Sequence, residues 1–344
     1  MTVLIVGGGK MGMSHLALAT HYLGKPNVAL CDTKLSTRLL FRFLGYQTFD
    51  SLDAAAARLD QLDGVLIATP TSSHAPLAHW AITRRVPFFV EKPLTLDVRS
   101  SEELYNRASS AGTPAQVGFV MRHVATFQRL RQLVAEGALG RLNGYTASMF
   151  GNVVTKPPAP ESWQGDFSRG GGCLNEYGPH IIDLCCFIFG PVVEIGGAEM
   201  GRVYSSRADD RVGVNWVHDD STPGQVEINW CEPSKRKSVI EFQAKFEYAN
   251  VRVDNSAVEI VWHANSPVSP ELRAKINVPV KPKNVGFYLR GEEFSLELEE
   301  FLGACVGRNL HVDETVSNDI TALLKDGYEV DQLIDKIACK VGLK

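Results

Sequence analysis

A glycine loop between two short apolar runs is the feature that most constrains the fold. Residues 3–6 are apolar, and residues 7–12 follow with the pattern G-x-G-x-x-G. A helical pattern starts after this loop, and a second apolar run, residues 28–31, ends at Asp32. This order is typical of the first β-α-β unit of a Rossmann dinucleotide-binding domain. A glycine-rich turn that binds nothing is the alternative.

Each glycine of such a loop has its own purpose. Gly7 allows the tight turn, Gly9 lets the backbone approach a pyrophosphate, and Gly12 lets helix and strand pack closely. Lys10 and Met11 stand at the start of the helix. We expect all five residues to bind the cofactor, because the N–H groups and positive dipole end of a helix N-terminus attract phosphates.

The acid after the second strand indicates which cofactor binds. A carboxylate at Asp32 accepts hydrogen bonds from both ribose hydroxyls of NAD and repels the 2′-phosphate of NADP. Lys34 and Arg38 lie close by in the sequence and can soften that repulsion. We therefore predict NAD, with NADP as the second choice.

Strand and helix patterns alternate as far as residue 119. Further strands are expected at 65–68, 86–90 and 115–119, with helices at 35–43, 53–59, 75–84 and 97–111. Open parallel sheets bind ligands beyond the carboxyl ends of their strands. Thr69, Pro70 and His74 follow one such end, and Glu91 and Lys92 follow the next. We expect these five to bind the cofactor, although His74 can simply begin a helix and Lys92 can be a surface residue.

Residues 170–183 contain a second set of candidate functional side chains. Three glycines open the segment, and an apolar pattern of roughly three helical turns follows. Glu176, His180 and Asp183 are four and three residues apart, so we expect them on one side of the helix. Two acids and an imidazole aimed together suit proton transfer. A capped core helix is the alternative.

The second half of the chain changes character. A helix is expected at 121–137, a strand at 142–150, and a loop at 151–172 in which Trp163 can stack on a sugar and Arg169 can meet hydroxyls or a phosphate. Residues 192–288 look strand-like throughout, with strands at 212–217, 225–230, 239–246, 251–254 and 258–262. Helices are expected at 292–306 and 315–338.

This pattern predicts two domains. Residues 1–120 form a Rossmann dinucleotide-binding domain with a doubly wound parallel sheet. Residues 121–344 form an α+β domain for substrate binding and oligomerisation, built on an open, mainly antiparallel sheet packed on helices. A second copy covering one face of this sheet would make a homodimer or homotetramer.

Composition excludes several classes of protein. A net charge of −4 and a pI near 6.2 argue against nucleic-acid binding. No apolar run approaches the ~20 residues of a membrane span, and we expect no signal peptide before the first strand. The seven cysteines contain no C-x-x-C pair, so we expect reduced thiols, no metal site and a cytoplasmic protein.

Taken together, the motifs resemble the glucose–fructose oxidoreductase / inositol dehydrogenase (Gfo/Idh/MocA) family of NAD(P)-dependent oxidoreductases. The resemblance rests on the order and spacing of residues 7–12, 68–74, 91–93, 118–122 and 163–183. It implies that Lys92 contacts the reacting hydroxyl and helps its proton leave, and that His180 is the general acid/base.

Other positions match the family with two departures. Glu176 stands where many members have aspartate, and it would orient His180 or bind a substrate hydroxyl. Asp183 and Arg122 match family residues and are expected at the substrate, whereas His123 stands where an aromatic residue is more usual.

The expected function is hydride transfer between nicotinamide and a hydroxyl or keto carbon of a sugar, polyol or sugar nucleotide. Two other functions stay open. One is an NAD-dependent glycoside hydrolase that oxidises its substrate transiently, and the other is a non-catalytic NAD-binding regulator. Reduction of an imine or a double bond is a remote possibility.

Overall fold

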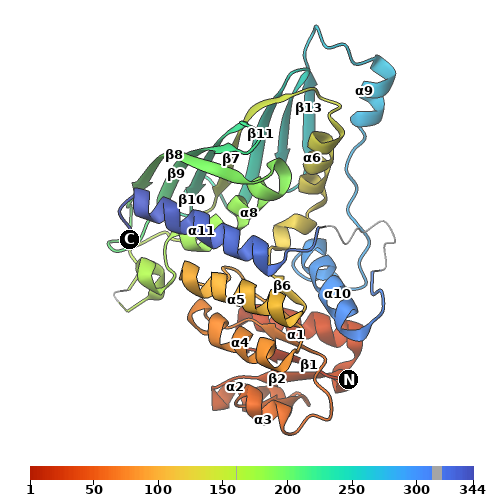
Figure 1. The fold of residues 1–344 in the computed structure, drawn as a ribbon, viewed down its shortest axis with the longest axis vertical. Coiled ribbons are helices and arrows are strands. Elements are labelled where there is room, and N and C mark those ends of the chain that lie inside the picture. The colour runs from red at the N-terminus through yellow and green to blue at the C-terminus, as the bar shows by residue number, and fades with distance from the viewer. Residues whose placement is uncertain (160, 312–319) are drawn as a thin grey trace. The chain divides into compact units, whose positions relative to one another are not determined.

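The computed structural model describes residues 1–159, 161–311 and 320–344 (Figure 1). They form two compact units. The first contains Met1–His123 and Lys283–Asp331, and the second contains Val124–Pro282 and Gln332–Lys344. The predicted helix at 315–338 begins outside the described residues, since 315–319 are not among them.

The first unit is built on six parallel strands in the order β3-β2-β1-β4-β5-β6, as in a doubly wound dinucleotide-binding fold. The strands are β1 (Val3–Val6), β2 (Val28–Cys31), β3 (Gln47–Phe49), β4 (Gly64–Ile67), β5 (Phe88–Val90) and β6 (Ala115–Val117). The predicted doubly wound parallel sheet is confirmed. β3 was not predicted as a strand, because three residues carry too little pattern.

Helices connect these strands close to the predicted positions. They are α1 (Lys10–Leu23), α2 (Leu35–Phe43), α3 (Leu52–Ala56), α4 (His74–Arg84) and α5 (Val98–Ala111). Short 3₁₀ turns are η1 (Lys25–Asn27), η2 (Thr71–Ser73) and η3 (Val120–His123).

The chain returns to the first unit late in the sequence. Helix α10 (Glu292–Val306) packs its apolar residues Leu298, Phe301 and Leu302 into one core cluster with Ile5 and Leu16. The sequence pattern had placed this segment in the second domain, because nothing local shows which core an apolar helix joins. The predicted boundary at residue 120 stays a prediction.

The second unit contains seven strands in the order β13-β12-β11-β7-β10-β9-β8. They are β7 (Leu142–Phe150), β8 (Val192–Gly201), β9 (Arg211–His218), β10 (Pro223–Asn229), β11 (Val239–Phe246), β12 (Ala249–Asp254) and β13 (Val258–Trp262). Only β7 and β10 pair in parallel, so the prediction of a mainly antiparallel sheet is confirmed.

One face of this sheet is apolar and packs on helices. Alternate residues of β9, β10 and β11 are buried, and α6 (Ala125–Glu136) and α8 (Gly178–Phe189) contact the sheet. Tyr145 of β7 stacks on Phe189 of α8 at 4.0 Å between ring centroids. The opposite face carries polar side chains such as Gln225, Glu227 and Gln243.

The remaining elements of the described chain are short or lie at the C-terminus. They are η4 (Trp163–Gly165), η5 (Phe167–Arg169), α7 (Cys173–Glu176), α9 (Pro270–Ile276) and α11 (Leu324–Lys340). Helix α9 corrects the prediction that residues 192–288 are strand-like throughout. It starts at a proline and is capped by the Ser269 side chain, which accepts the Leu272 N–H at 3.3 Å.

Candidate active site

The glycine loop between β1 and α1 is shaped by two contacts that exclude side chains. A Cβ atom on Gly7 would lie 2.6 Å from the carbonyl oxygen of Ala68, and one on Gly12 would lie 1.8 Å from the carbonyl oxygen of Gly7. A Cβ atom on Gly9 would meet nothing within 4 Å. Packing therefore requires two of the glycines and leaves open space at Gly9, where a pyrophosphate is expected to approach the backbone.

The first turn of α1 faces this open space without a side-chain cap. Gly9 is the N-cap residue and has no side chain to accept from the first N–H groups of the helix, which belong to Lys10, Met11 and Gly12. Uncapped N–H groups at a helix N-terminus are suitable partners for phosphate oxygens.

Asp32 lies at the end of β2 beside the loop. Its carboxylate accepts the backbone N–H groups of Gly8 and Lys34, each at 2.7 Å. Arg38 donates from Nη1 to the carbonyl oxygens of Asp32 at 2.8 Å and Thr33 at 2.7 Å. The acid that favours NAD and the cation that would tolerate NADP are thus both held by the backbone at one strand end.

The segment after β4 contains Thr69, whose hydroxyl makes no hydrogen bond within the described chain, and His74, whose two ring nitrogens both lie within hydrogen-bond distance of carbonyl oxygens. Thr69 Oγ1 is buried and has no hydrogen-bond partner within the described chain, as expected of a group that awaits a ligand; Pro70 beside it is exposed. His74 is 1% exposed, with Nδ1 3.0 Å from the Pro93 carbonyl oxygen and Nε2 3.0 Å from that of Thr69. Burial lowers the pKa of His74. His74 therefore links two loops, and its contact with the cofactor stays a prediction.

Lys92 follows Glu91, whose half-buried side chain is paired with a buried histidine. Nε2 of His15, on α1, donates to Oε1 of Glu91 at 2.7 Å, and the His15 side chain is 2% exposed. Burial raises the pKa of Glu91, but the hydrogen bond and charge of His15, with the charge of Lys92, outweigh it, so that the pKa falls below 4.5. Glu91 is therefore a carboxylate, only 13% exposed, that anchors Lys92.

The same loop is anchored again beyond Pro93. The backbone N–H and hydroxyl of Thr95 donate to Oδ2 of Asp331, on α11, at 2.9 and 3.2 Å. Neither His15 nor Asp331 was predicted. His15 had one usable signal, because it lies on the inward face of the predicted first helix. Asp331 had none, since it lies 236 residues from its partner.

Arg122 and His123 follow β6 and are both buried. Nη2 of Arg122 lies 3.0 Å from Oδ1 of Asp326, and its guanidinium stands over the Phe119 ring at 5.8 Å. Burial, and then the charge of Arg122, lower the pKa of His123 to about 3. The charge of Arg122 is therefore paired within the first unit, and its contact with substrate stays a prediction.

In the second unit, the predicted glycine triplet is a tightly packed turn. Gly170 and Gly172 have φ values of +88° and +93°, which favour glycine. A Cβ atom on Gly171 would lie 2.3 Å from the Trp163 carbonyl oxygen, and one on Gly172 would lie 2.1 Å from Oδ1 of Asp209. The triplet is thus required by packing around the start of α7.

Two adjacent buried acids, which the sequence did not reveal, hold this turn and its surroundings. The Asp209 carboxylate accepts the Leu174 N–H at 2.7 Å and the Cys173 S–H at 3.0 Å. Burial raises the pKa of Asp209. Burial acts in the same direction on Asp210, but its donors outweigh it and lower that pKa. These donors are the N–H groups of Val203, Tyr204 and Ser205, the Ser205 hydroxyl and the Trp230 indole.

The expectation of one helix through residues 176, 180 and 183 is wrong in its first turn. Glu176 ends α7, and α8 starts at Gly178, with Tyr177 between them. The break has a physical cause, because Pro179 has no N–H to continue the helix from α7. His180 and Asp183 do share α8 three residues apart, as predicted. His180 is half-buried and Asp183 is 1% exposed.

The loop before the triplet presents its two predicted substrate residues differently. The Trp163 side chain is 44% exposed in η4, as a stacking surface requires. Arg169 is exposed and donates from Nη1 to the Glu161 carbonyl oxygen at 2.9 Å. Both contacts with substrate stay predictions.

Two family models match this chain. One, described as an oxidoreductase family with an NAD-binding Rossmann fold, matches residues 1–119, and the other, the GFO/IDH/MocA C-terminal domain, matches residues 127–247. The chain belongs to the Gfo/Idh/MocA family. The resemblance seen in the sequence motifs is thereby confirmed.

Curated Gfo/Idh/MocA relatives match over part of their length. Inositol 2-dehydrogenase 1 of Mycolicibacterium vanbaalenii is 34% identical over 143 residues, which cover 40% of this chain and 41% of the relative. The rhizopine catabolism protein MocA of Rhizobium meliloti is 28% identical over 186 residues, or 54% and 56% of the two chains. The chain thus matches about half the length of these relatives or less.

Solved Gfo/Idh/MocA structures share the fold over nearly the whole chain. Levoglucosan dehydrogenase in complex with NADH and levoglucosan has a TM-score of 0.79 at 19% identity, with 99% of this chain and 97% of that chain covered. The WlbA dehydrogenase of Bordetella pertussis in complex with NADH and UDP-GlcNAcA has a TM-score of 0.75 at 18% identity, with 99% and 95% covered. At this identity the likeness shows the fold alone.

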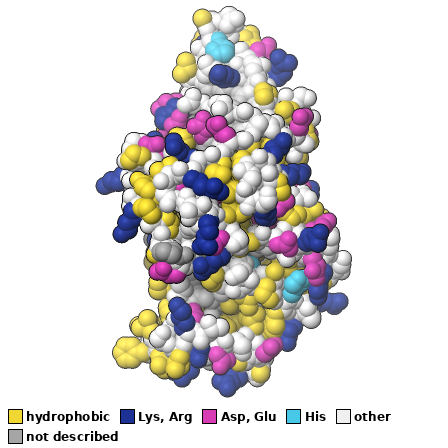
Figure 2. All heavy atoms as spheres, turned by 90° about the vertical axis from the view of Figure 1, so that its left-hand side faces the viewer, with side chains coloured by type: hydrophobic (Ala, Val, Ile, Leu, Met, Phe, Trp, Pro, Cys, Tyr) yellow, Lys and Arg dark blue, Asp and Glu magenta, His cyan; other side chains and the backbone are white. Residues whose placement is uncertain are grey.

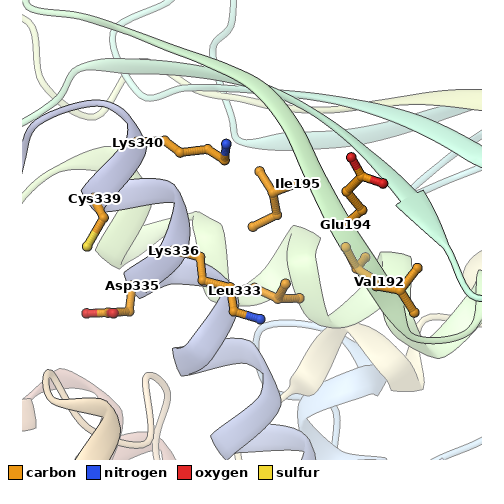
Figure 3. A pocket seen from close by; sticks show the side chains of 9 residues that line it. Val192, Glu194, Ile195, Leu333, Asp335, Lys336, Cys339 and Lys340 are labelled. Carbon is orange, nitrogen blue, oxygen red and sulfur yellow. The ribbon is translucent and has the colours of Figure 1, made fainter.

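A pocket of about 390 Å³ lies elsewhere in this Gfo/Idh/MocA chain (Figure 3). It is within the second unit, between β8 and the end of α11, and its lining includes Ile195, Leu333, Lys336 and Lys340. No predicted site residue lines it. Within the described ranges, no three His, Cys, Asp or Glu side chains gather as a metal site would require, and no helix is long and apolar enough to span a membrane.

Proposed function

We propose that this protein is an NAD-dependent dehydrogenase or reductase that acts on a hydroxyl or keto carbon of a sugar, polyol or sugar nucleotide. The observation that carries the proposal is the loop of Lys92, which is fixed through Glu91, Pro93 and Thr95 by three buried side chains. A surface lysine needs no such support, whereas a cation that must meet a reacting group needs a fixed position.

The residues around the glycine loop fit a dinucleotide. Gly9 leaves room for phosphate, Asp32 presents a carboxylate for the ribose, and Thr69 offers a buried hydroxyl. Bound NAD would supply the hydride acceptor. Two of the similar proteins are named inositol 2-dehydrogenase and levoglucosan dehydrogenase, and the WlbA dehydrogenase is in complex with UDP-GlcNAcA. These names support a polyhydroxylated substrate.

In the proposed reaction the chain's own residues move and hold the proton. His180 takes the proton of the substrate hydroxyl at an imidazole nitrogen, as a general base. The Lys92 ammonium stabilises the negative charge that develops on that oxygen. Glu176 orients His180 or binds a hydroxyl. Arg122, Trp163, Arg169 and Asp183 bind the substrate. In reduction the same residues act in reverse.

The test is the near-ultraviolet absorbance of reduced nicotinamide. Purified protein is mixed with NAD or NADP and a panel of polyols, sugars, sugar acids and sugar nucleotides, and then with NADH and the matching keto compounds. We expect one class to give turnover, faster with NAD. His180→Asn should abolish that turnover while NADH binding, followed by its fluorescence, is kept.

Matched variants make the result specific. Asp32→Ala should weaken NADH binding, while Asp50→Ala, which removes an exposed acid after the neighbouring strand β3, should not. Turnover that survives Lys92→Ala would contradict the catalytic assignment. Release of an aglycone without net formation of NADH would favour the glycoside hydrolase, and tight NADH binding with no turnover in either direction would favour the regulator.

The assembly and location of the protein are further proposals. We propose a homodimer or homotetramer through the polar outer face of the seven-stranded sheet, because a flat exposed sheet face can be covered by its own copy. Light scattering tests this proposal, and cell fractionation tests the expected cytoplasmic location.

A further inference from the structure

Helix α2 carries its apolar side chains on the side that faces solvent. A surface helix normally buries its apolar face, yet Phe41 is the one buried residue of α2. In Figure 2, hydrophobic side chains project at the lower left, at the height where Figure 1 places α2. The exposed apolar residues, which we call the α2 face, are Leu35 at 60%, Leu39 at 52%, Leu40 at 54%, Phe43 at 88% and Leu44 at 46%.

The two cations of the same helix make hydrogen bonds within its own unit. Arg38 donates to the carbonyl oxygens of Asp32 and Thr33, and Arg42 donates from Nη2 to Oγ1 of Thr48 at 3.3 Å. Arg38 is half-buried, whereas Arg42 stays exposed, as do the leucines. A contiguous exposed apolar patch of this kind marks an interaction site.

We propose that the α2 face binds the α2 face of a second copy of this chain around a twofold axis. Leu35, Leu39 and Phe43 are four residues apart and form one ridge, while Leu40 and Leu44 form another. Ridges of this spacing pack into the grooves of a facing helix. Since one helix supplies both sides, the contact is self-complementary and closes at two copies.

The charges favour a second copy over an anionic membrane. A helix that lies on a lipid surface keeps lysines and arginines free to reach the headgroups. Here Arg38 and Arg42 are bonded within the first unit, and Arg42, although exposed, lies at the margin of the α2 face by its helical position. Two copies can therefore meet without like charges at the centre of the contact.

The exposed area matches a modest dimer interface. The five exposed fractions amount to about three whole side chains, and at roughly 100–200 Å² each two copies would bury roughly 600–1,200 Å². Stable interfaces begin near ~1,200 Å² in total, so we expect a weak, concentration-dependent contact. This inference does not depend on the proposed activity, and it uses a different surface from the sheet face discussed above.

The first test measures mass against concentration by light scattering and sedimentation. Wild-type protein should show one doubling of mass as concentration rises, and Leu39→Glu should lose it. Val278→Glu, which charges a similarly exposed apolar residue outside both the α2 face and the sheet (59% exposed), is the matched control and should keep it. Phe43→Ser is the second variant if Leu39→Glu fails to fold. Equal masses for wild type and both α2 variants at every concentration would overturn the proposal.

The second test locates the contact by cross-linking. Leu40→Cys, in a background where the exposed Cys339 is changed to Ser, should form a disulfide dimer on mild oxidation, and Val278→Cys should not. Equal cross-linking of the two would overturn the proposal. Sedimentation with phosphatidylserine vesicles that is lost in Leu39→Glu, with no self-association, would also overturn it and assign the α2 face to lipid.

Discussion

Replacing His15 with leucine should destabilise the first unit far more than a surface substitution does. His15→Leu keeps an apolar side chain beside Phe89 but removes the donor that lies 2.7 Å from the Glu91 carboxylate. The remaining charge is then buried without its partner, and breaking a buried pair in this way costs about 3–5 kcal/mol. Replacing both residues, in His15→Leu with Glu91→Met, should restore stability to within about 1 kcal/mol of wild type.

The sign of the pH dependence follows from the lowered pKa of Glu91. Its carboxylate contributes stability that is complete above the unfolded pKa of 4.5 and is lost as pH falls through the folded value. In His15→Leu, burial acts on Glu91 without the opposing histidine, so protonation relieves the cost. The difference between wild type and variant should therefore be largest at pH 7 and should narrow toward pH 4.

The assay is urea unfolding followed by hydrogen exchange and mass spectrometry of peptides from β1 and β5, which report on the first unit alone. The control is His79→Leu, because His79 and Glu103 form a partly exposed pair at 3.6 Å in the same unit. That variant should cost at most about 1 kcal/mol. Equal losses in the two variants, or a His15→Leu loss that does not change with pH, would refute the reasoning.

Three further predictions concern the glycine loop, the two adjacent buried acids, and the buried His123. Gly9→Ala should change the free energy of unfolding by no more than about 0.5 kcal/mol but weaken NAD binding roughly tenfold, as measured by calorimetry. Gly12→Ala, whose Cβ atom would meet a carbonyl oxygen at 1.8 Å, should unfold at a lower urea concentration. The reverse order would contradict the loop assignment. Asp210→Asn should lower the free energy of unfolding by about 2–3 kcal/mol at pH 7, because it removes a charged acceptor whose pKa is lowered. Asp209→Asn should lower it by less than about 1 kcal/mol, because burial opposes the charge of Asp209. Equal losses of stability in urea titrations of the two variants would contradict this prediction. In the wild type, the pKa of His123 is about 3 when folded and 6.5 when unfolded, so stability is lost as pH falls through that interval. His123→Phe should therefore reduce the loss of unfolding free energy between pH 7 and pH 5 by about 2 kcal/mol. An unchanged slope of melting temperature against pH would contradict this prediction.

The parts of the fold that the sequence predicts are those set by short-range patterns. The strands β1 and β2 and the helix α1 follow from apolar runs placed around glycines, and β7 runs over 142–150 as expected. The missed elements, β3 with three residues and α9 with seven, contain no continuous apolar run and too few positions for a period to show. Helix α10 was found as a helix but placed with the wrong core, because its apolar stripe fits any apolar surface.

Short-range patterns also explain why the site residues could be predicted and the residues that anchor them could not. Lys92, Asp32 and the glycine loop stand in motifs, so their spacing is visible. The anchors are single polar residues whose partners are far away in sequence: His15 lies 76 residues from Glu91, and Asp331 lies 236 residues from Thr95. A buried polar residue can be recognised only when the surface that buries it is known.

Asp209 and Asp210 show why residue type alone could not predict the charge state of a buried acid. They are adjacent, have the same side chain, and are both fully buried. The Asp210 carboxylate receives five donors, most of them from residues 203–205, and its pKa is lowered. Asp209 has two donors, one oxygen without a partner in the described chain, and a raised pKa. The chemistry of each acid is therefore decided by how many N–H groups the surrounding turns direct at it, which depends on backbone geometry that no local motif records.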